Sequence, residues 1–358
     1  MTGEVFSVAL PADSDLLNWI GPARDPALHP LSAPGFWGND GFPSFAMAAA
    51  KRGTCEANGR HDLGVLPSTV PVFALVACQR TGTQLLREIL NSSSAIALLA
   101  EPFSASPEPV YWQNFVRTLP SSEFPPQSAG DALALVDRYV ALIRRDVDRT
   151  CEWYGGSKSQ LRAVGLDVKY NQLRCANPIF SDLRTQPLLI EYFRARQIPI
   201  VHLVRGNLAH NALSMIIANM RRVWHTYDGR PIEGRYRVSP ADLIGYMVWI
   251  KEERDEFMRL AQDLTIQMFV YEDLVDDLSR INAAGDFPED TRVLSRLATF
   301  LDVPNHFRND RQMRKVINRP YSDILENCDE LVAALEMSGF SEFAPTLLPA
   351  PESAVQRR

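Results

Sequence analysis

The feature that most constrains how this chain folds is a repeated alternation of short apolar runs with segments of helical spacing. Short apolar runs predict strands at 72–78, 96–100, 163–169, 198–204 and 266–271, and the continuous run at 72–78 is typical of a strand buried on both faces of a parallel sheet. Apolar residues three and four apart predict helices at 85–90, 131–147, 188–196, 208–220, 239–264 and 291–301. Strands that alternate with helices predict an α/β fold, in which helices flank a central parallel β-sheet.

The segments outside this alternation set the expected domain limits. Residues 1–70 are rich in Pro, Gly and Ala and have weak periodicity, so we expect an irregular N-terminal extension. One domain is predicted over 71–345, followed by a C-terminal tail at 346–358. Within the domain, the Pro- and Ser-rich stretch 104–128 and the stretch 224–238 are predicted loops.

Charge and cysteine content exclude several classes of protein. The net charge is −6 and there is no long basic run, so we expect no nucleic-acid partner. The five cysteines are widely spaced and form no CxxC pair, which favours reduced thiols in the cytoplasm over a zinc site. The first eleven residues lack the pattern of a signal peptide, and no apolar stretch reaches the roughly 18 to 20 residues of a membrane span.

The turn between the first strand and the first helix has the features of an anion site. Its sequence, Cys-Gln-Arg-Thr-Gly-Thr-Gln at 78–84, places Gly82 at a tight turn just before a helix N-terminus, where phosphate-like anions bind. Arg80, Thr81 and Thr83 add one charge and two hydroxyl donors. The pattern GxxxxGK[ST] is absent, and with it the Lys and hydroxyl that serve terminal phosphates and magnesium. The turn is therefore either an anion site without magnesium or a plain connection with two capping threonines.

A second signal follows the fourth predicted strand. That strand ends at Arg205, and Ser214 lies about two turns into the next helix. A strand-end guanidinium and a helix hydroxyl can hold one phosphate from two sides. The alternative is a surface arginine and a serine bonded to its own helix backbone.

These two segments resemble motifs of sulfotransferases that depend on 3′-phosphoadenosine 5′-phosphosulfate (PAPS). The 5′-phosphosulfate loop of that family commonly has the sequence Pro-(Lys/Arg)-(Ser/Thr)-Gly-(Ser/Thr)-x-Leu; here Gln79 replaces the Pro, and the other positions fit. The pair Arg205 and Ser214 is similar to the 3′-phosphate motif, with an interval of nine residues where many members have eight. The resemblance implies that Arg80 and the loop amides neutralise the phosphosulfate as part of catalysis, and that Arg205 and Ser214 hold the 3′-phosphate. It also implies donor contacts from Thr81, Gly82, Thr83 and Gln84.

Three later segments are similar to the same family, in the same order, so that the resemblance spans about residues 70–340. They are the sequences at 269–274, at 301–304 and at 319–331. The resemblance implies a P-loop NTPase-like sulfotransferase fold. It also implies that Arg319 contacts the 3′-phosphate side of the nucleotide.

Sulfuryl transfer to a hydroxyl requires a base that removes the acceptor proton. Glu101 follows the second predicted strand, on the edge of a parallel sheet where ligands bind. Bacterial and carbohydrate-type members carry a Glu base there; the alternative is a solvated loop carboxylate. Lys169, at the end of the third predicted strand, is expected to contact the acceptor or the sulfate.

Several histidines and aromatic residues are further candidates for the site, each with a structural alternative. His202 lies within an apolar strand and is predicted to be a core histidine. His210 and His225 are surface or pocket residues. Trp153, Tyr154 and Trp224 belong either to the core or to the wall of an acceptor pocket.

The resemblance implies an enzyme that transfers a sulfuryl group from PAPS, as co-substrate and without a metal, to an acceptor hydroxyl. A carbohydrate or small natural product is the favoured acceptor, while lipid and peptide tyrosine remain open. Two alternatives stand beside it: a non-catalytic nucleotide-binding protein on a sulfotransferase fold, and a degenerate P-loop kinase.

Overall fold

The computed structural model describes residues 70–104, 111–120, 126, 128–145, 147, 160–177, 186–222, 234–282, 285–309 and 319–348. Apart from residue 70, the predicted N-terminal extension lies outside these residues, as does the tail from 349 onward. The same holds for four candidate residues, Trp153, Tyr154, Trp224 and His225.

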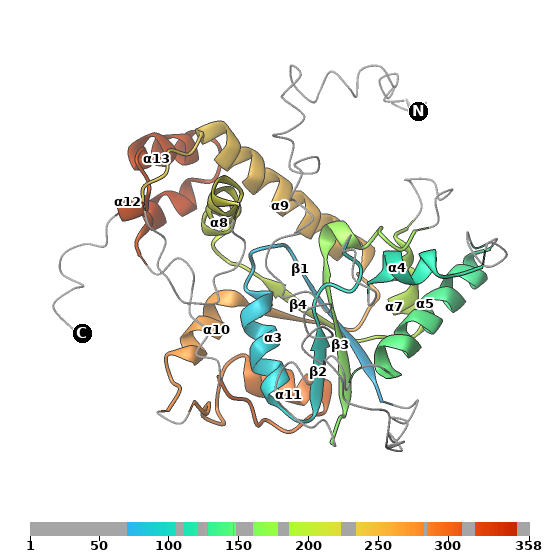
Figure 1. The fold of residues 1–358 in the computed structure, drawn as a ribbon. Helices are drawn as coiled ribbons and strands as arrows, with labels where there is room; N and C mark the ends of the chain where they lie inside the picture. Colours follow the sequence, from blue (N-terminus) through green and yellow to red (C-terminus); the bar gives the residue numbers. More distant parts are fainter. Residues whose placement is uncertain are drawn as a thin grey trace, which may run out of the picture.

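Five parallel strands form one sheet at the centre of the described structure, which confirms the predicted fold class (Figure 1). They are β1 (Val72–Ala77), β2 (Ile96–Leu99), β3 (Ala163–Lys169), β4 (Ile200–Val204) and β5 (Ile266–Val270). The strand order is β2-β3-β1-β4-β5, so β1 lies between β3 and β4. In the pairing register, Ala77 at the end of β1 faces Lys169 on one side and Leu203 on the other. The carboxyl ends of these three strands therefore meet at one edge of the sheet.

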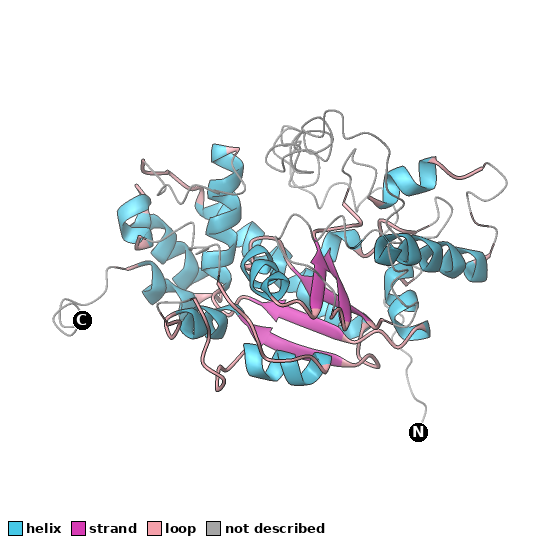
Figure 2. Cartoon of the chain, turned by 60° about the horizontal axis from the view of Figure 1, so that its bottom comes forward, coloured by secondary structure: helices cyan, strands magenta, loops and turns pink. Residues whose placement is uncertain are grey.

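Helices cover both faces of the sheet (Figures 1 and 2). On one face, Ala74 and Val76 of β1 belong to a core built with α5 (Ala129–Arg145), α7 (Leu188–Ala195), α8 (Leu208–Arg221) and α9 (Pro240–Leu260). On the other face, Phe73 and Leu75 belong to a core built with α3 (Thr83–Ser92), α10 (Tyr271–Leu278) and α11 (Leu294–Leu301). Because successive side chains of a strand point to opposite faces, a strand covered on both sides needs an unbroken apolar run.

Shorter elements complete the described chain. The 3₁₀ helix η3 (Tyr170–Gln172) follows β3 directly. Near the C-terminus lie α12 (Tyr321–Ile324), α13 (Cys328–Met337) and the 3₁₀ helix η4 (Ser341–Leu347), beside α8 and α9 in Figure 1. The predicted start of the long helix is confirmed: the Ser239 hydroxyl accepts from the Asp242 amide, and Pro240 is the first helical residue.

Two predictions of local structure were wrong. The predicted loop at 104–128 contains α4 (Trp112–Arg117), because Trp112 packs against Phe103 and Tyr139 and this tertiary contact outweighs the loop-forming composition. Tyr271, placed by its sequence in the last strand, is instead the first residue of α10. Within the described residues, no helix is both long enough and apolar enough to cross a membrane.

Candidate active site

The loop between β1 and α3 lies at the carboxyl edge of the sheet and depends on Gly82. Its backbone has φ 94°, and a Cβ built on it would lie 2.3 Å from two ring atoms of Tyr271. Only glycine permits both this left-handed conformation and this close approach. No side chain caps the N-terminus of α3. Thr81 is buried, and its hydroxyl has no hydrogen-bond partner. The loop thus presents backbone amides and a free hydroxyl, the groups that bind an oxyanion.

On the β4 side of this loop, two arginines and a serine meet. Arg80 has φ 61°, and its Nε donates to Ser214 Oγ over 3.2 Å. Arg205 donates from Nη1 to the Arg80 carbonyl over 3.4 Å, and its guanidinium lies 5.1 Å from the ring centre of Tyr271. Burial, and then the charge of Arg205, lower the pKa of Arg80 to about 10. Arg80 therefore remains cationic at neutral pH, and with the Arg205 guanidinium beside it this cluster attracts anions.

A glutamate fixes the turn that carries Arg205. The Glu272 carboxylate accepts from the amides of Gly206 and Asn207, over 2.9 and 3.2 Å. The same carboxylate lies 3.9 Å from Arg205 Nε, which is buried and makes no hydrogen bond. Glu272 therefore holds the start of α8 and leaves donor capacity on Arg205.

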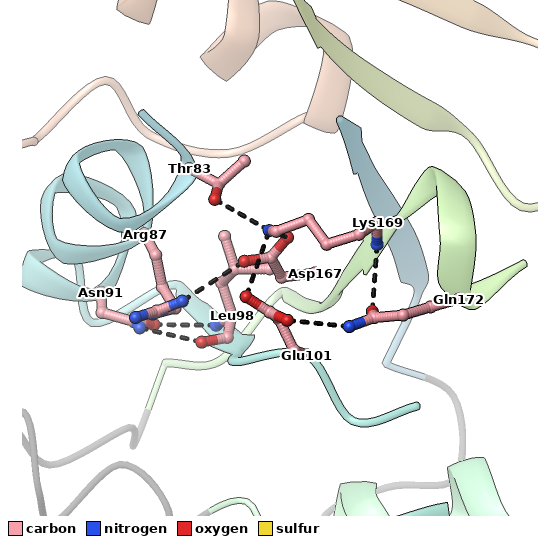
Figure 3. A network of polar contacts seen from close by, with 8 residues as sticks. All are labelled: Thr83, Arg87, Asn91, Leu98, Glu101, Asp167, Lys169 and Gln172. Atoms are coloured by element: carbon pink, nitrogen blue, oxygen red, sulfur yellow. Dashed lines mark hydrogen bonds and ion pairs between the residues drawn. The ribbon is translucent and has the colours of Figure 1, made fainter. Parts of the chain in front are cut away.

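On the β3 side of the loop, Glu101 and Lys169 meet (Figure 3). Lys169 Nζ donates to Thr83 Oγ1 over 2.8 Å and lies 3.7 Å from Glu101 Oε1. Gln172 donates from Nε2 to Glu101 Oε2 over 2.8 Å, while its Oε1 accepts from the Lys169 amide. The Glu101 carboxylate, about one-third exposed, is thus held beside the loop hydroxyl by a cation and an amide.

A buried ion pair lies beneath this group. Asp167 is fully buried, accepts from Lys169 Nζ, and lies 3.3 Å from Arg87 Nη1 of α3 (Figure 3). Burial raises the pKa of Asp167, and the nearby Lys169 opposes that effect. The pair ties α3 to β3 and fixes the Lys169 ammonium at the sheet edge.

The structure thus brings most of the proposed site residues to one edge, in two groups on either side of the loop. Arg319 is not among them: it is exposed and donates to the Asp323 carbonyl over 3.4 Å. Its near neighbour Tyr321 reaches the arginine cluster instead. Tyr321 is buried, its hydroxyl donates to the His210 carbonyl over 3.1 Å, and its ring lies 4.6 Å from that of His210.

Sequence reasoning missed Tyr321, Tyr271 and Gln172 as parts of this edge. The two tyrosines stand within segments that resemble the family, and Gln172 follows closely after Lys169, but their buried environment is a tertiary property. His202 is confirmed as a core residue: it is fully buried and shares a 2.6 Å hydrogen bond with the Tyr170 hydroxyl. In the described part of the chain, no group of three or more His, Cys, Asp or Glu side chains is arranged to hold a metal ion.

In comparisons with known proteins, no family model matches the chain and no curated protein matches it. Among solved structures, the chain is similar to a sulfotransferase from Alicyclobacillus acidocaldarius, with 17% identity and a TM-score of 0.38 over 80% of this chain and 96% of that one. It is also similar to the sulfotransferase domain from the curacin biosynthetic pathway, with 13% identity and a TM-score of 0.33 over 70% and 80%. Because both TM-scores are below 0.5, we base the function on the residues of this chain.

Proposed function

We propose that this protein is a sulfotransferase that moves a sulfuryl group from PAPS to an acceptor hydroxyl. The observation that carries the proposal is the meeting of Glu101, Lys169 and the loop residue Thr83 at the edge of a parallel sheet, next to a cluster of two arginines. One group offers a base and a cation for chemistry, and the other offers positive charge for a phosphorylated donor.

The donor is proposed to lie across the loop. Its 3′-phosphate is held by Arg205 and Ser214, and its phosphosulfate by the amides and hydroxyls that begin α3. Unpaired donors in this region support that placement, namely Arg205 Nε and the Thr81 hydroxyl. The loop contacts proposed for the donor are Arg80, Thr81, Gly82, Thr83 and Gln84. Arg319 remains a proposed contact of the 3′-phosphate.

In the proposed reaction, Glu101 accepts the proton of the acceptor hydroxyl as its oxygen attacks sulfur. The new oxygen–sulfur bond forms while the bond from sulfur to the bridging phosphate oxygen breaks. That electron pair, and the charge that develops with it, stays on the bridging oxygen of adenosine 3′,5′-bisphosphate, and Lys169 contacts the sulfuryl group during its transfer. Glu101 itself has φ 41°, a strained conformation for a non-glycine residue, of the kind that concentrates at active sites.

The acceptor is proposed to be a carbohydrate or a small natural product, because the Glu base pattern is that of members acting on such hydroxyls. We propose no metal requirement, since the loop lacks the Lys–Ser/Thr pair that serves magnesium. A cytoplasmic location is proposed as well. The cysteines in the described part, Cys78, Cys175 and Cys328, are free, which is compatible with a reducing compartment.

Transfer from labelled PAPS to a panel of hydroxyl acceptors tests this function. Glu101→Gln keeps the size of the side chain but cannot take a proton, so we expect turnover to fall by about 10²- to 10⁴-fold. Affinity for adenosine 3′,5′-bisphosphate should stay within about threefold of the wild type, because the residue faces the acceptor. Glu252→Gln, on the exposed side of α9, is the matched control.

The proposed role of Glu101 fails if Glu101→Gln keeps near-normal turnover on a confirmed acceptor. Tight nucleotide binding with no transfer to any acceptor would instead favour the non-catalytic alternative.

A further inference from the structure

Arg80 belongs to the loop in sequence, but its side chain lies on the other side of β1 from the sulfuryl chemistry. The strand order places β1 between β3, which carries Lys169, and β4, which leads to Arg205. Thr83 contacts Lys169 on the β3 side. Arg80 contacts Ser214 of α8 on the β4 side. The loop therefore divides its polar side chains between two neighbouring subsites.

The backbone of the loop is held in this orientation by α8. Asn211, in the amide orientation that satisfies its surroundings, donates to the carbonyls of Gln79 and Arg80 over 3.1 and 3.3 Å. Arg205 donates to the same Arg80 carbonyl. Because Asn211 and Ser214 lie on adjacent turns of one helix, they fix both the main chain and the side chain of Arg80 against α8.

Two neighbouring guanidiniums repel each other unless an anion lies between them. Arg205 is buried, with only 6% of its side chain exposed, and its Nε makes no hydrogen bond. The Glu272 carboxylate lies 3.9 Å from that nitrogen and accepts hydrogen bonds from two backbone amides. A dianion bound by both arginines relieves this repulsion and satisfies the buried donor.

A tyrosine from the C-terminal segment closes the same cluster. Burial raises the pKa of Tyr321 to about 12, and the charges of Arg205 and Arg80 oppose that rise. The hydroxyl therefore stays protonated and lies within electrostatic reach of both arginines. It donates to the His210 carbonyl of α8, a neutral acceptor that an anionic oxygen can replace.

We propose that Arg80 and Arg205 form one subsite for a dianionic phosphate, completed by the hydroxyls of Ser214 and Tyr321. Resting on the proposed function, this phosphate is the 3′-phosphate of the donor. Arg80 then binds the 3′-phosphate and not the phosphosulfate, while Lys169 and Thr83 contact the sulfuryl group. Tyr321 is then a second residue, besides the proposed Arg319, through which the C-terminal segment contacts the nucleotide.

Calorimetry with adenosine 3′-phosphate and adenosine 5′-phosphate tests this assignment. We expect Arg80→Ala to weaken adenosine 3′-phosphate by about 10- to 100-fold, the range for a hydrogen bond to a charged group, and adenosine 5′-phosphate by no more than about threefold. Tyr321→Phe should show the same selectivity with a smaller loss, of about three- to tenfold. Arg237→Ala, an exposed arginine paired with Glu330, is the matched control and should change neither affinity.

The assignment is overturned if Arg80→Ala weakens adenosine 5′-phosphate as much as adenosine 3′-phosphate. Should Arg80→Ala fail to fold, Arg80→Lys keeps the charge but loses the guanidinium geometry, and it must still lose adenosine 3′-phosphate selectively.

A further experiment distinguishes failure of this inference from failure of the proposed function. If the wild type binds neither nucleotide, the proposed function fails, and thermal shift with inorganic phosphate then tests the subsite alone. Stabilisation by phosphate that disappears in Arg80→Ala upholds the two-arginine subsite. Stabilisation that Arg80→Ala leaves unchanged, or its absence in the wild type, overturns it.

Discussion

At the scale of single residues, Gly82 shows how one position determines whether the loop can form. Its φ of 94° is costly for any other residue, and the Tyr271 ring occupies the space where a Cβ would lie. Gly234 has a similar φ of 88°, but no atom lies within 4 Å of the position that a Cβ would take there. Comparing substitutions at the two glycines therefore separates the cost of the left-handed backbone from the cost of the steric overlap with Tyr271.

We expect Gly82→Ala to destabilise the protein more than Gly234→Ala does. Both substitutions cost about 1 to 2 kcal/mol for a left-handed alanine, and Gly82→Ala adds about 1 to 3 kcal/mol because Tyr271 must move. Urea unfolding measures the difference in the free energy of unfolding. Equal losses in the two variants would mean that Tyr271 does not restrict the loop.

At the scale of secondary-structure elements, a buried histidine joins β4 to η3 beneath the site. His202 of β4 shares a hydrogen bond with Tyr170, the first residue of η3, and its ring lies 4.8 Å from that of Phe257 in α9. Burial, and then the charge of Arg254, lower the pKa of His202 to about 4. The neutral ring thus helps to align the ends of β3 and β4, from which Lys169 and Arg205 reach the site.

This histidine makes stability depend on pH. In the unfolded chain its pKa is about 6.5, so between about pH 6.5 and 4 the unfolded state binds a proton that the folded state does not. The contribution of His202 to the free energy of unfolding is therefore fully present above about pH 6.5. It declines as the pH falls toward 4, by up to about 3 kcal/mol.

Urea unfolding at several pH values measures this decline, and His202→Gln should remove its share of the slope. His306→Gln is the control, because His306 is exposed and should leave the wild-type slope in place. A slope that is the same in His202→Gln and in the wild type would contradict the proposed linkage.

The same elements show what the sequence could predict. All five strands were found. The strands β1 to β4 are buried along nearly their whole length, and such a strand shows in the sequence as a mostly apolar run that needs no knowledge of its partners. The edge strand β5 is only partly buried. The helix α4 was missed because it is only six residues long and depends on aromatic contacts with Phe103 and Tyr139. Its existence is determined by packing, which local composition does not report.

Candidate site residues were predictable to a similar extent. Glu101, Lys169 and Arg205 could be placed at strand ends from the sequence, and parallel strands bring such ends to one edge. The direction in which the Arg80 side chain points could not be predicted. It depends on a left-handed backbone and on contacts with a helix more than 130 positions later in the chain. Tyr321 was hidden for the same reason, because its burial depends on α8.

At the scale of the whole molecule, the order of the strands organises the site. With β1 in the middle, the loop that follows it lies between the carboxylate–lysine group of β3 and the arginine cluster of β4. A donor that carries one anion at each end of a nucleoside fits such a divided edge. The C-terminal helices complete the arginine side, beside α8 and α9 (Figure 1).

The central claim is that this edge binds a 3′-phosphorylated adenylate without magnesium. Calorimetric titration of the full-length chain with adenosine 3′,5′-bisphosphate, in EDTA and then in magnesium, tests it most directly, with ATP as the competing ligand. We predict that the bisphosphate binds equally well in both buffers and at least about tenfold more tightly than ATP with magnesium. Loss of bisphosphate binding in EDTA, or tighter binding of magnesium–ATP, would contradict the claim and favour the P-loop kinase alternative.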